Sequence, residues 1–233
     1  MNIILTGASK GIGYETALQL AARGGNSILA IARSEKQLKE LKNKVDAEFS
    51  QSHLDYFVFD FYKGDFNLLK KEIRKQFKTL DILINNAGFL IAKPFLEISA
   101  DDFDQTFTIN IKSVFQLCQL AIPLMKKGSH IVNISSMGGV QGSVKFSGLS
   151  AYSASKGALS VLTESLAVEL NEKGIAVNAL ALGAVDTAML RLAFPHFKAP
   201  LTAQEMGAYV AEFATTGSSY FNGKIVPLSV STP

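Results

Sequence analysis

Cysteine and histidine are scarce in this sequence. Cys118 is the single cysteine among 233 residues, and the three histidines lie far apart in different kinds of segment, at positions 53, 130 and 196. One thiol excludes an intramolecular disulfide and a cysteine-based metal cluster, and the histidine spacing matches no set of metal ligands. The sequence therefore predicts no metal site, a buried and unreactive Cys118, and a reducing, cytoplasmic location.

Long apolar runs and an excess of one charge are also absent. No apolar stretch approaches the roughly 18 residues that a membrane-spanning helix needs. Residues 1–7 lack the basic and apolar regions of a secretory signal, so we expect nothing to precede the fold. The 23 basic and 20 acidic residues leave a net charge of only +3. This balance argues against nucleic acids and membranes as partners and leaves small-molecule ligands open.

Apolar residues make up 48% of the chain, and many gather in short runs separated by helical segments. The runs are continuously apolar, as in parallel strands covered on both faces, and the segments between them are long enough for right-handed helical crossovers. We therefore predict one α/β domain over residues 1–233, a doubly wound sheet of about seven parallel strands with helices on both faces. The expected strands are Asn2–Thr6, Ser27–Ala32, Tyr56–Asp60, Asp81–Asn85, His130–Ile134, Ala176–Leu182 and Ile225–Val230, and the expected helices are Gly11–Gly24, Ser34–Ser50, Asp65–Lys78, Asp101–Lys127, Ala151–Lys173 and Thr202–Thr215.

Two of the expected helices carry more apolar surface than a helix covered on one side needs. Residues 101–127 and 152–170 place apolar side chains around most of the helical circumference. A large monomer core is one explanation, and a second copy of the chain is the other. We favour the second and predict a homodimer or homotetramer.

A glycine-rich turn, Thr6–Gly13, joins the first expected strand to the first expected helix. Its glycines allow a tight turn and a close approach of backbone to phosphate, and the following helix N-terminus offers free N–H groups to an anion. This position within a βαβ series predicts a pyrophosphate cradle of a dinucleotide. The cradle residues are Gly7, Ser9, Lys10, Gly11, Ile12 and Gly13.

The end of the second strand lies beside the adenosine ribose in such a site, and its charge selects the cofactor. An acidic residue there binds the free 2′-hydroxyl of NAD, whereas a basic residue pairs with the 2′-phosphate of NADP. Arg33 stands there, 20 residues after Gly13, with Lys10 in the first turn and no carboxylate before Glu35. The sequence therefore predicts NADP(H) as cofactor, the alternative being that Arg33 is a solvated surface charge.

Tyr152 and Lys156 lie four residues apart on an expected helix, and therefore on one face of it. A nearby ammonium stabilises a phenolate and is expected to lower the phenol pKa, so that the phenol exchanges a proton with a carbonyl or alcohol oxygen. Ser135 and Ser136 end the fifth expected strand, where ligands bind in open α/β sheets. The spacing of Tyr152 and Lys156 and the position of the two serines together predict a catalytic site at this edge of the sheet.

Five motifs in order resemble the classical short-chain dehydrogenase/reductase family over nearly the whole chain. They are Thr6–Gly13, Asn85–Gly88, Asn110, Ser135–Ser136 and Tyr152–Lys156. The resemblance implies a Rossmann-type domain that transfers hydride between a nicotinamide and a carbonyl or alcohol carbon.

The resemblance also implies roles for individual residues. Tyr152 would be the general acid/base, Lys156 would lower its pKa and bind the nicotinamide ribose, Ser136 would bind the substrate oxygen, and Asn110 would hold a water of the proton relay. Further cofactor contacts would come from Asp60 at the adenine, from Asn86, Ala87 and Gly88, and from Val185 and Thr187 near the nicotinamide.

Three features depart from the family pattern. The interval from Ser136 to Tyr152 is longer than usual and rich in glycine, which predicts a pliable loop and an unusual pocket wall. Leu182-Gly183 replaces the common Pro-Gly, which predicts a less rigid turn before Thr187. The C-terminus lacks the acidic-Gly-Gly ending common in tetrameric members, so dimer and tetramer stay open.

Apolar residues on the loops at the active-site ends of the strands predict an apolar substrate pocket under a fairly open lid. We expect an NADPH-dependent carbonyl reductase acting on medium-sized apolar or aromatic carbonyl compounds. The alternatives are a 3-oxoacyl carrier-protein reductase, for which Lys93, Lys145 and Arg191 are candidate docking residues, and a non-catalytic NADPH-binding sensor. The pocket residues are Phe89, Leu90, Phe146, Met189, Leu190, Phe194 and Phe197.

Overall fold

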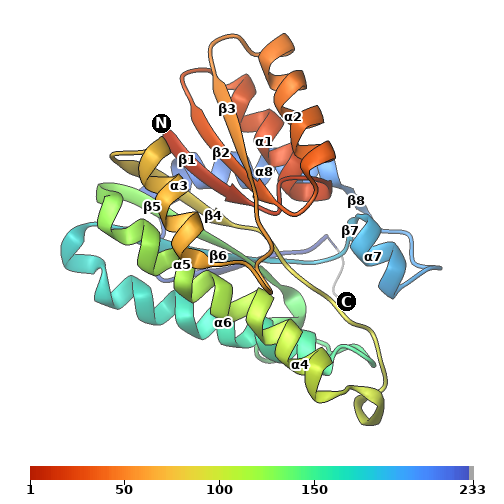
Figure 1. Ribbon diagram of the computed structural model, residues 1–233. Coiled ribbons are helices and arrows are strands. Elements are labelled where there is room, and N and C mark those ends of the chain that lie inside the picture. The colour runs from red at the N-terminus through yellow and green to blue at the C-terminus, as the bar shows by residue number, and fades with distance from the viewer. Residues whose placement is uncertain (231–233) are drawn as a thin grey trace.

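The computed structural model describes residues 1–230 and is built on a seven-stranded parallel sheet with strand order β3-β2-β1-β4-β5-β6-β9. The strand order reverses beside β1, because the chain first builds outward to β3 and then returns to place β4 on the other side (Figure 1). This confirms the predicted doubly wound α/β fold. The strands are β1 (Asn2–Thr6), β2 (Ser27–Ala32), β3 (His53–Val58), β4 (Leu80–Asn85), β5 (Met125–Ser136), β6 (Ala176–Leu182) and β9 (Ile225–Leu228).

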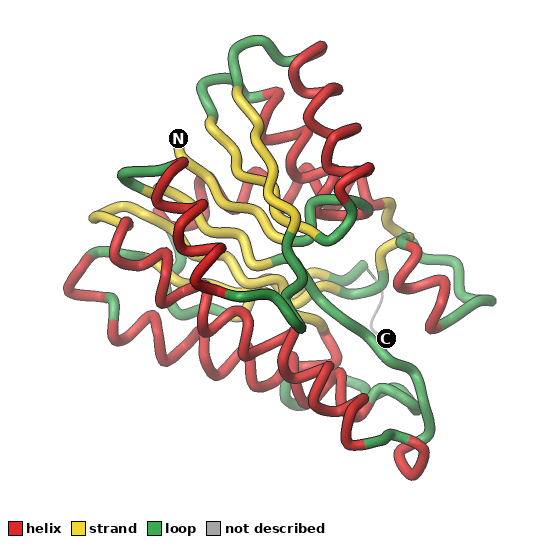
Figure 2. Tube along the Cα trace, in the orientation of Figure 1, coloured by secondary structure: helices red, strands yellow, loops and turns green. Residues whose placement is uncertain are grey.

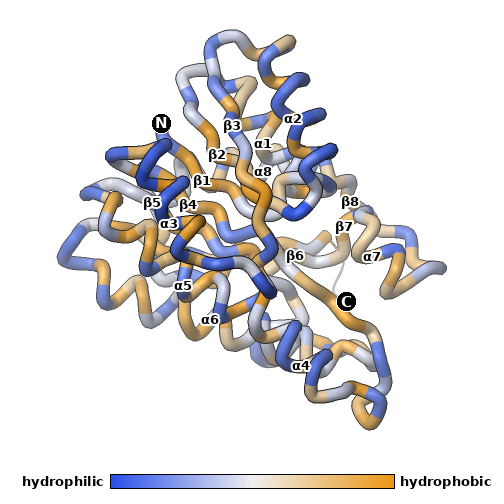
Figure 3. The backbone as a smooth tube through the Cα atoms, viewed as in Figure 1, coloured by the Kyte–Doolittle hydropathy of each residue, from blue (hydrophilic) through white to orange (hydrophobic). Residues whose placement is uncertain are grey.

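Helices cover both faces of the sheet, as Figure 2 shows. Successive side chains of a strand point to opposite faces. In β1, Ile3 and Leu5 pack with α1, α2 and α8, whereas Ile4 packs with α3, α5 and α6. Figure 3 shows the central strands as hydrophobic and the outer faces of α2 and α3 as hydrophilic. The helices are α1 (Gly11–Ala22), α2 (Glu35–Glu48), α3 (Phe66–Gln76), α4 (Ala100–Phe107), α5 (Ser113–Ala121), α6 (Ser150–Glu169), α7 (Ala188–Ala193) and α8 (Ala203–Thr216).

Two predicted elements have different bounds in the structure. The expected helix Asp101–Lys127 consists of α4, a π-helical turn, α5 and a 3-10 turn. It ends near Pro123, which has no N–H for a helical bond, and Met125 already pairs with Leu80 as the start of β5. The expected strand Tyr56–Asp60 is shifted, because β3 pairs with β2 from His53 onward.

The segment after β6 contains small elements that the sequence did not predict. Two short strands, β7 (Val185–Asp186) and β8 (Leu201–Thr202), pair with each other and hold α7 between them at the carboxyl edge of the sheet. Within residues 1–230, no helix is long and apolar enough to cross a bilayer. Residues 231–233 lie outside the described residues, so the predicted domain range 1–233 stays a prediction at that end.

Candidate active site

Three glycines shape the turn after β1. Gly7 and Gly11 have φ angles of +68° and +59°, in the left-handed region that favours glycine. A Cβ on Gly13 would lie 2.3 Å from the Gly7 carbonyl oxygen and 2.4 Å from the Asn86 Nδ2. The first two glycines therefore permit the conformation of the turn, and Gly13 permits α1 to pack directly against it beside the cavity.

The N-terminus of α1 faces the same cavity, and within residues 1–230 no side chain caps its first N–H groups. Lys10 occupies the N-cap position without a side-chain cap, and the first turn contains no acidic residue. Free N–H groups and the helix dipole favour an anion here. The glycine-rich turn and the uncapped helix fit the pyrophosphate of a dinucleotide.

Hydrogen bonds attach the end of β4 to this turn. The Thr6 hydroxyl accepts from the backbone N–H groups of Asn86 and Ala87 at 3.0 and 2.9 Å, and Asn86 Nδ2 donates to the Thr6 carbonyl at 3.0 Å. These bonds place the segment from Asn86 to Gly88 on the cavity wall.

The side of the cavity at the end of β2 is basic. Arg33 and Lys10 both line it, and within residues 1–230 neither forms an ion pair with a carboxylate. Ser34 and Gln37 line it as well. Neither of these two polar residues was among the predicted cofactor residues, although Ser34 directly follows Arg33.

Asp60 follows β3 and also lines the cavity, beside Phe61. One of its oxygens, Oδ1, accepts from the Tyr62 N–H at 2.8 Å, so that the carboxylate closes a turn of its own. Its expected contact with adenine stays a prediction, with the second carboxylate oxygen as the group available for it.

Tyr152 and Lys156 occupy the first two turns of α6, at the carboxyl ends of β5 and β6. The Lys156 Nζ donates to the Ile134 carbonyl at 2.7 Å and lies 5.9 Å from the centre of the Tyr152 ring. Burial lowers the pKa of the Lys156 ammonium to about 8, so most molecules carry the charge at pH 7. The pair lies on one helix face, as the spacing predicted.

The phenol of Tyr152 is harder to ionise than the sequence suggested. Burial raises its pKa above the usual value, and a hydrogen bond with Ser136 lowers it only in part. The net pKa is therefore raised, because burial disfavours the phenolate more strongly than the hydrogen bond with Ser136 stabilises it, and the expected lowering by Lys156 stays a prediction. A phenol that stays protonated suits a proton donor.

Asn110 lies in the π-helical turn between α4 and α5 and is fully buried behind the cavity wall. Its Oδ1 accepts from the Phe89 N–H at 2.8 Å, and its Nδ2 donates to the Phe89 carbonyl and the Ser155 hydroxyl, each at 2.9 Å. Ser155 in turn donates to the Tyr152 carbonyl at 2.7 Å. The side chain of Asn110 thus connects α6 to the loop after β4, and its expected contact with a water stays a prediction.

The two serines at the end of β5 have different surroundings. Ser135 is buried, and although it also lines the cavity, its hydroxyl is occupied by donating to the Lys156 carbonyl at 3.1 Å. The Ser136 hydroxyl accepts from the Gly138 N–H at 3.2 Å at the cavity, beside Tyr152. Ser136 is therefore the serine placed to meet a substrate oxygen.

The turn after β6 is held more firmly than the Leu182-Gly183 sequence suggested. The Gly183 N–H donates to the Leu228 carbonyl of β9 at 2.7 Å, which braces the turn. Beyond it, Val185 is buried, and the Thr187 hydroxyl caps α7 by accepting from the Leu190 N–H at 3.2 Å. The Thr187 methyl group would lie 3.6 Å from a Cβ on Gly11, so this residue reaches the cradle.

One cavity of about 1170 Å³ joins these regions. It is larger than the roughly 300–1,000 Å³ of a site for one small ligand, which fits a dinucleotide together with a substrate. All the predicted cofactor residues line it, as do Ser136 and all seven predicted apolar pocket residues, whereas Asn110 does not. The chain thus brings the predicted site together from segments far apart in sequence.

Comparisons with known proteins agree with this geometry. Residues 1–196 match the short chain dehydrogenase family. The chain is 34% identical to carbonyl reductase (NADPH) 2 of Sus scrofa over 82% of this chain and 72% of the relative. It is 36% identical to a 3-oxoacyl-(acyl-carrier-protein) reductase of Staphylococcus aureus over 80% of this chain and 75% of the relative.

A solved structure shows a similar fold. A short chain dehydrogenase of Burkholderia cenocepacia J2315, in complex with NADP, superposes with a TM-score of 0.88. Its sequence is 27% identical, and the match covers 99% of this chain and 96% of the other.

Proposed function

The chain belongs to the short-chain dehydrogenase family, and we propose that within this family it is an NADPH-dependent carbonyl reductase. Members are oxidoreductases that use nicotinamide cofactors. The observation that carries the proposal is the common cavity, in which Tyr152, Lys156 and Ser136 lie together with the glycine-rich cradle and a basic end.

Each of these residues would have a separate role in carbonyl reduction. Bound NADPH would supply the hydride for the carbonyl carbon. The Ser136 hydroxyl would bind the carbonyl oxygen, and the Tyr152 phenol, protonated at neutral pH, would give that oxygen its proton to complete the alcohol. The Lys156 ammonium would stabilise the phenolate left on Tyr152. Asn110 and Ser155 would hold the catalytic helix against the loop after β4.

The proposal is tested by following NADPH oxidation with purified protein against ketones, aldehydes, diketones and a 3-oxoacyl thioester. We expect turnover with an apolar or aromatic carbonyl compound and a preference for NADPH over NADH. A panel without turnover, despite NADPH binding, would count against a carbonyl reductase and for the sensor reading. The preferred compound would identify the substrate class.

Arg33→Asp is expected to raise the KM for NADPH at least about tenfold and to shift the preference toward NADH. The change removes a cation that pairs with the 2′-phosphate and places a carboxylate beside the ribose, where it repels phosphate and binds a free hydroxyl. Steady-state kinetics with both cofactors measure the shift. Lys39→Asp, on the exposed side of α2, is the matched control. Unchanged NADPH affinity in the Arg33 variant would remove this residue from cofactor recognition.

The similarity to a 3-oxoacyl-(acyl-carrier-protein) reductase makes that activity a second candidate. Its acidic carrier needs free basic side chains, and each of the three solvent-accessible candidates already contacts a group of this chain. Lys93 pairs with Asp102 at 2.7 Å, Arg191 pairs with Asp186, and Lys145 Nζ donates to the Val140 carbonyl at 2.5 Å. These contacts favour a small carbonyl compound over a carrier-bound acyl group.

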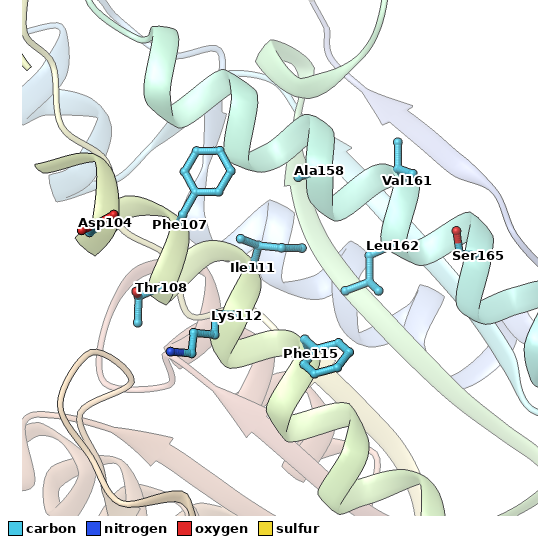
Figure 4. A pocket seen from close by; sticks show the side chains of 10 residues that line it. All are labelled: Asp104, Phe107, Thr108, Ile111, Lys112, Phe115, Ala158, Val161, Leu162 and Ser165. Atoms are coloured by element: carbon cyan, nitrogen blue, oxygen red, sulfur yellow. The ribbon is translucent and has the colours of Figure 1, made fainter. Parts of the chain in front are cut away.

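A homo-oligomer is the second part of the proposal. An open groove of about 570 Å³ lies between the α4–α5 segment and α6, where Phe107, Ile111 and Phe115 face Val161 and Leu162 (Figure 4). Phe115 is 47% exposed and Val161 is 62% exposed. Large apolar side chains left uncovered on adjacent helices favour a second copy of the chain as their cover.

Val161→Lys is expected to weaken self-association at least about tenfold, because it places a charge in an apolar contact. Sedimentation equilibrium measures the dissociation constant. Val168→Lys is the matched control, because Val168 lies on the same helix, is 78% exposed and lies outside the groove. Equal effects of the two substitutions would place the interface elsewhere.

A further inference from the structure

Two aromatic rings from different loops meet at the wall of the cavity. Phe146 lies in the loop between β5 and α6, and Phe194 directly follows α7. Their ring centres are 5.7 Å apart and their planes are inclined at 67°, the edge-to-face arrangement that aromatic pairs favour. Both residues line the cavity that holds Tyr152.

The loop that carries Phe146 is held in place by hydrogen bonds. The Ser143 hydroxyl donates to the carbonyls of Met137 and Val140 at 2.5 and 2.9 Å. On the other side of Phe146, the Gly148 carbonyl accepts from the Lys93 N–H at 3.1 Å. The sequence predicted a pliable loop from its glycines, but these bonds cross-link it, so Phe146 is the fixed member of the pair.

The segment that carries Phe194 is attached mainly at its two ends, where β7 and β8 pair with each other. None of the six residues of α7 is buried, although all are among the described residues. The helix is held by its Thr187 cap and by the exposed ion pair between Arg191 and Asp186. Since little apolar surface anchors this segment, Phe194 is the member that can yield to a ligand.

We propose that Phe146 and Phe194 determine substrate specificity by receiving the flat ring of an aromatic ketone or aldehyde against their rings. The inference rests on the proposed carbonyl reduction at Tyr152. A flat ring can replace the single edge-to-face contact with contacts to both phenylalanines, and it loses no internal rotation on binding. A saturated ring of equal carbon number is thicker and has no π face, so it gains less from the same site.

The test compares acetophenone with cyclohexyl methyl ketone, which share a carbon count and differ in the flatness of the ring, and with the small diketone 2,3-butanedione. We expect the wild type to favour acetophenone over the cyclohexyl ketone about tenfold in kcat/KM. Phe146→Leu and Phe194→Leu should each remove most of that preference through KM and should lower kcat/KM for acetophenone more than kcat/KM for butanedione. The double variant should lose little more than either single variant, because the two rings act as a pair.

Phe95→Leu is the matched control, since Phe95 is 75% exposed and lies outside the cavity. A second readout is independent of turnover: saturation-transfer NMR of both ketones with the NADPH-loaded protein. Loss of acetophenone binding in the two leucine variants, even without reduction of any ketone, would support the aromatic pair and refute the reductase. Equal preference for the two ketones in the wild type, or an unchanged preference in both variants, would overturn the pair.

Discussion

Replacing Tyr152 by phenylalanine is expected to lower kcat for carbonyl reduction at least about a hundredfold while NADPH affinity changes less than about threefold. A positioned general acid contributes about 10²–10⁴-fold to rate. The substitution removes the phenolic proton and leaves the ring, so the packing of α6 and the hydrogen bond from Ser155 to the backbone carbonyl of residue 152 are preserved. No other phenol lines the cavity within residues 1–230.

Single-turnover kinetics and an NADPH titration of the same variant separate chemistry from binding. Tyr220→Phe is the control, because Tyr220 is 80% exposed and lies outside the cavity. If the Tyr152 variant kept its activity, another group would be the proton donor. If it lost NADPH binding together with activity, the residue would be part of the cofactor site rather than the acid.

Lowering the pH from 7 to 4 is expected to cost about 3 kcal/mol of folding stability through His130 alone. The buried ring joins β5 to β6 and α8: its Nδ1 contacts the Ala214 carbonyl at 3.1 Å, and its Nε2 contacts the Asn178 Nδ2 at 3.0 Å. A neutral ring satisfies both contacts, with a proton on Nδ1 and a lone pair on Nε2. A second proton would face the Asn178 amide donor.

The direction of the pH effect follows from the pKa. Burial lowers the pKa of His130 from 6.5 to about 4, so the unfolded chain takes up the proton first. The stabilising contribution is complete above pH 6.5, is lost as the pH falls toward 4, and changes no further below 4.

Urea denaturation at several pH values measures this loss. His130→Gln should be less stable at pH 7 and should lack the component of the pH dependence between 6.5 and 4. His196→Gln is the control, because His196 is exposed and forms no ion pair within residues 1–230, so its variant should follow the wild type. Identical pH dependence in the His130 variant and the wild type would assign the acid sensitivity to other groups.

The fold was largely predictable because the sequence patterns that indicate its strands and turns each lie within one short segment. Continuous apolar runs marked the parallel strands, and the glycines of the first turn marked the cradle. The start of β5 was missed because Lys126 and Lys127 are not strand formers by composition, and only the pairing of Met125 with Leu80 makes this segment a strand. Tertiary pairing of this kind is not visible in a local window.

Sequence spacing predicted the residues of the site that lie on one helix. It did not predict contacts between residues that are far apart in the sequence. Tyr152 and Lys156 follow from one helix, whereas Ser155 acquires its role from Asn110, 45 residues away in sequence. The direction of the Tyr152 pKa was also missed, since it depends on how deeply the folded chain buries the phenol.

The hydrogen bonds of Asn110 have a consequence for how this scaffold can be diversified. Both bonds to residue 89 go to its backbone, and none goes to the phenylalanine ring. Another side chain at position 89 could therefore admit other substrates while the hydrogen bonds between Asn110 and the backbone of this residue are kept. A change in the length of the loop after β4 would instead displace the turn of α6 that carries Tyr152. Variation in this part of the cavity wall is therefore expected as substitutions and not as insertions.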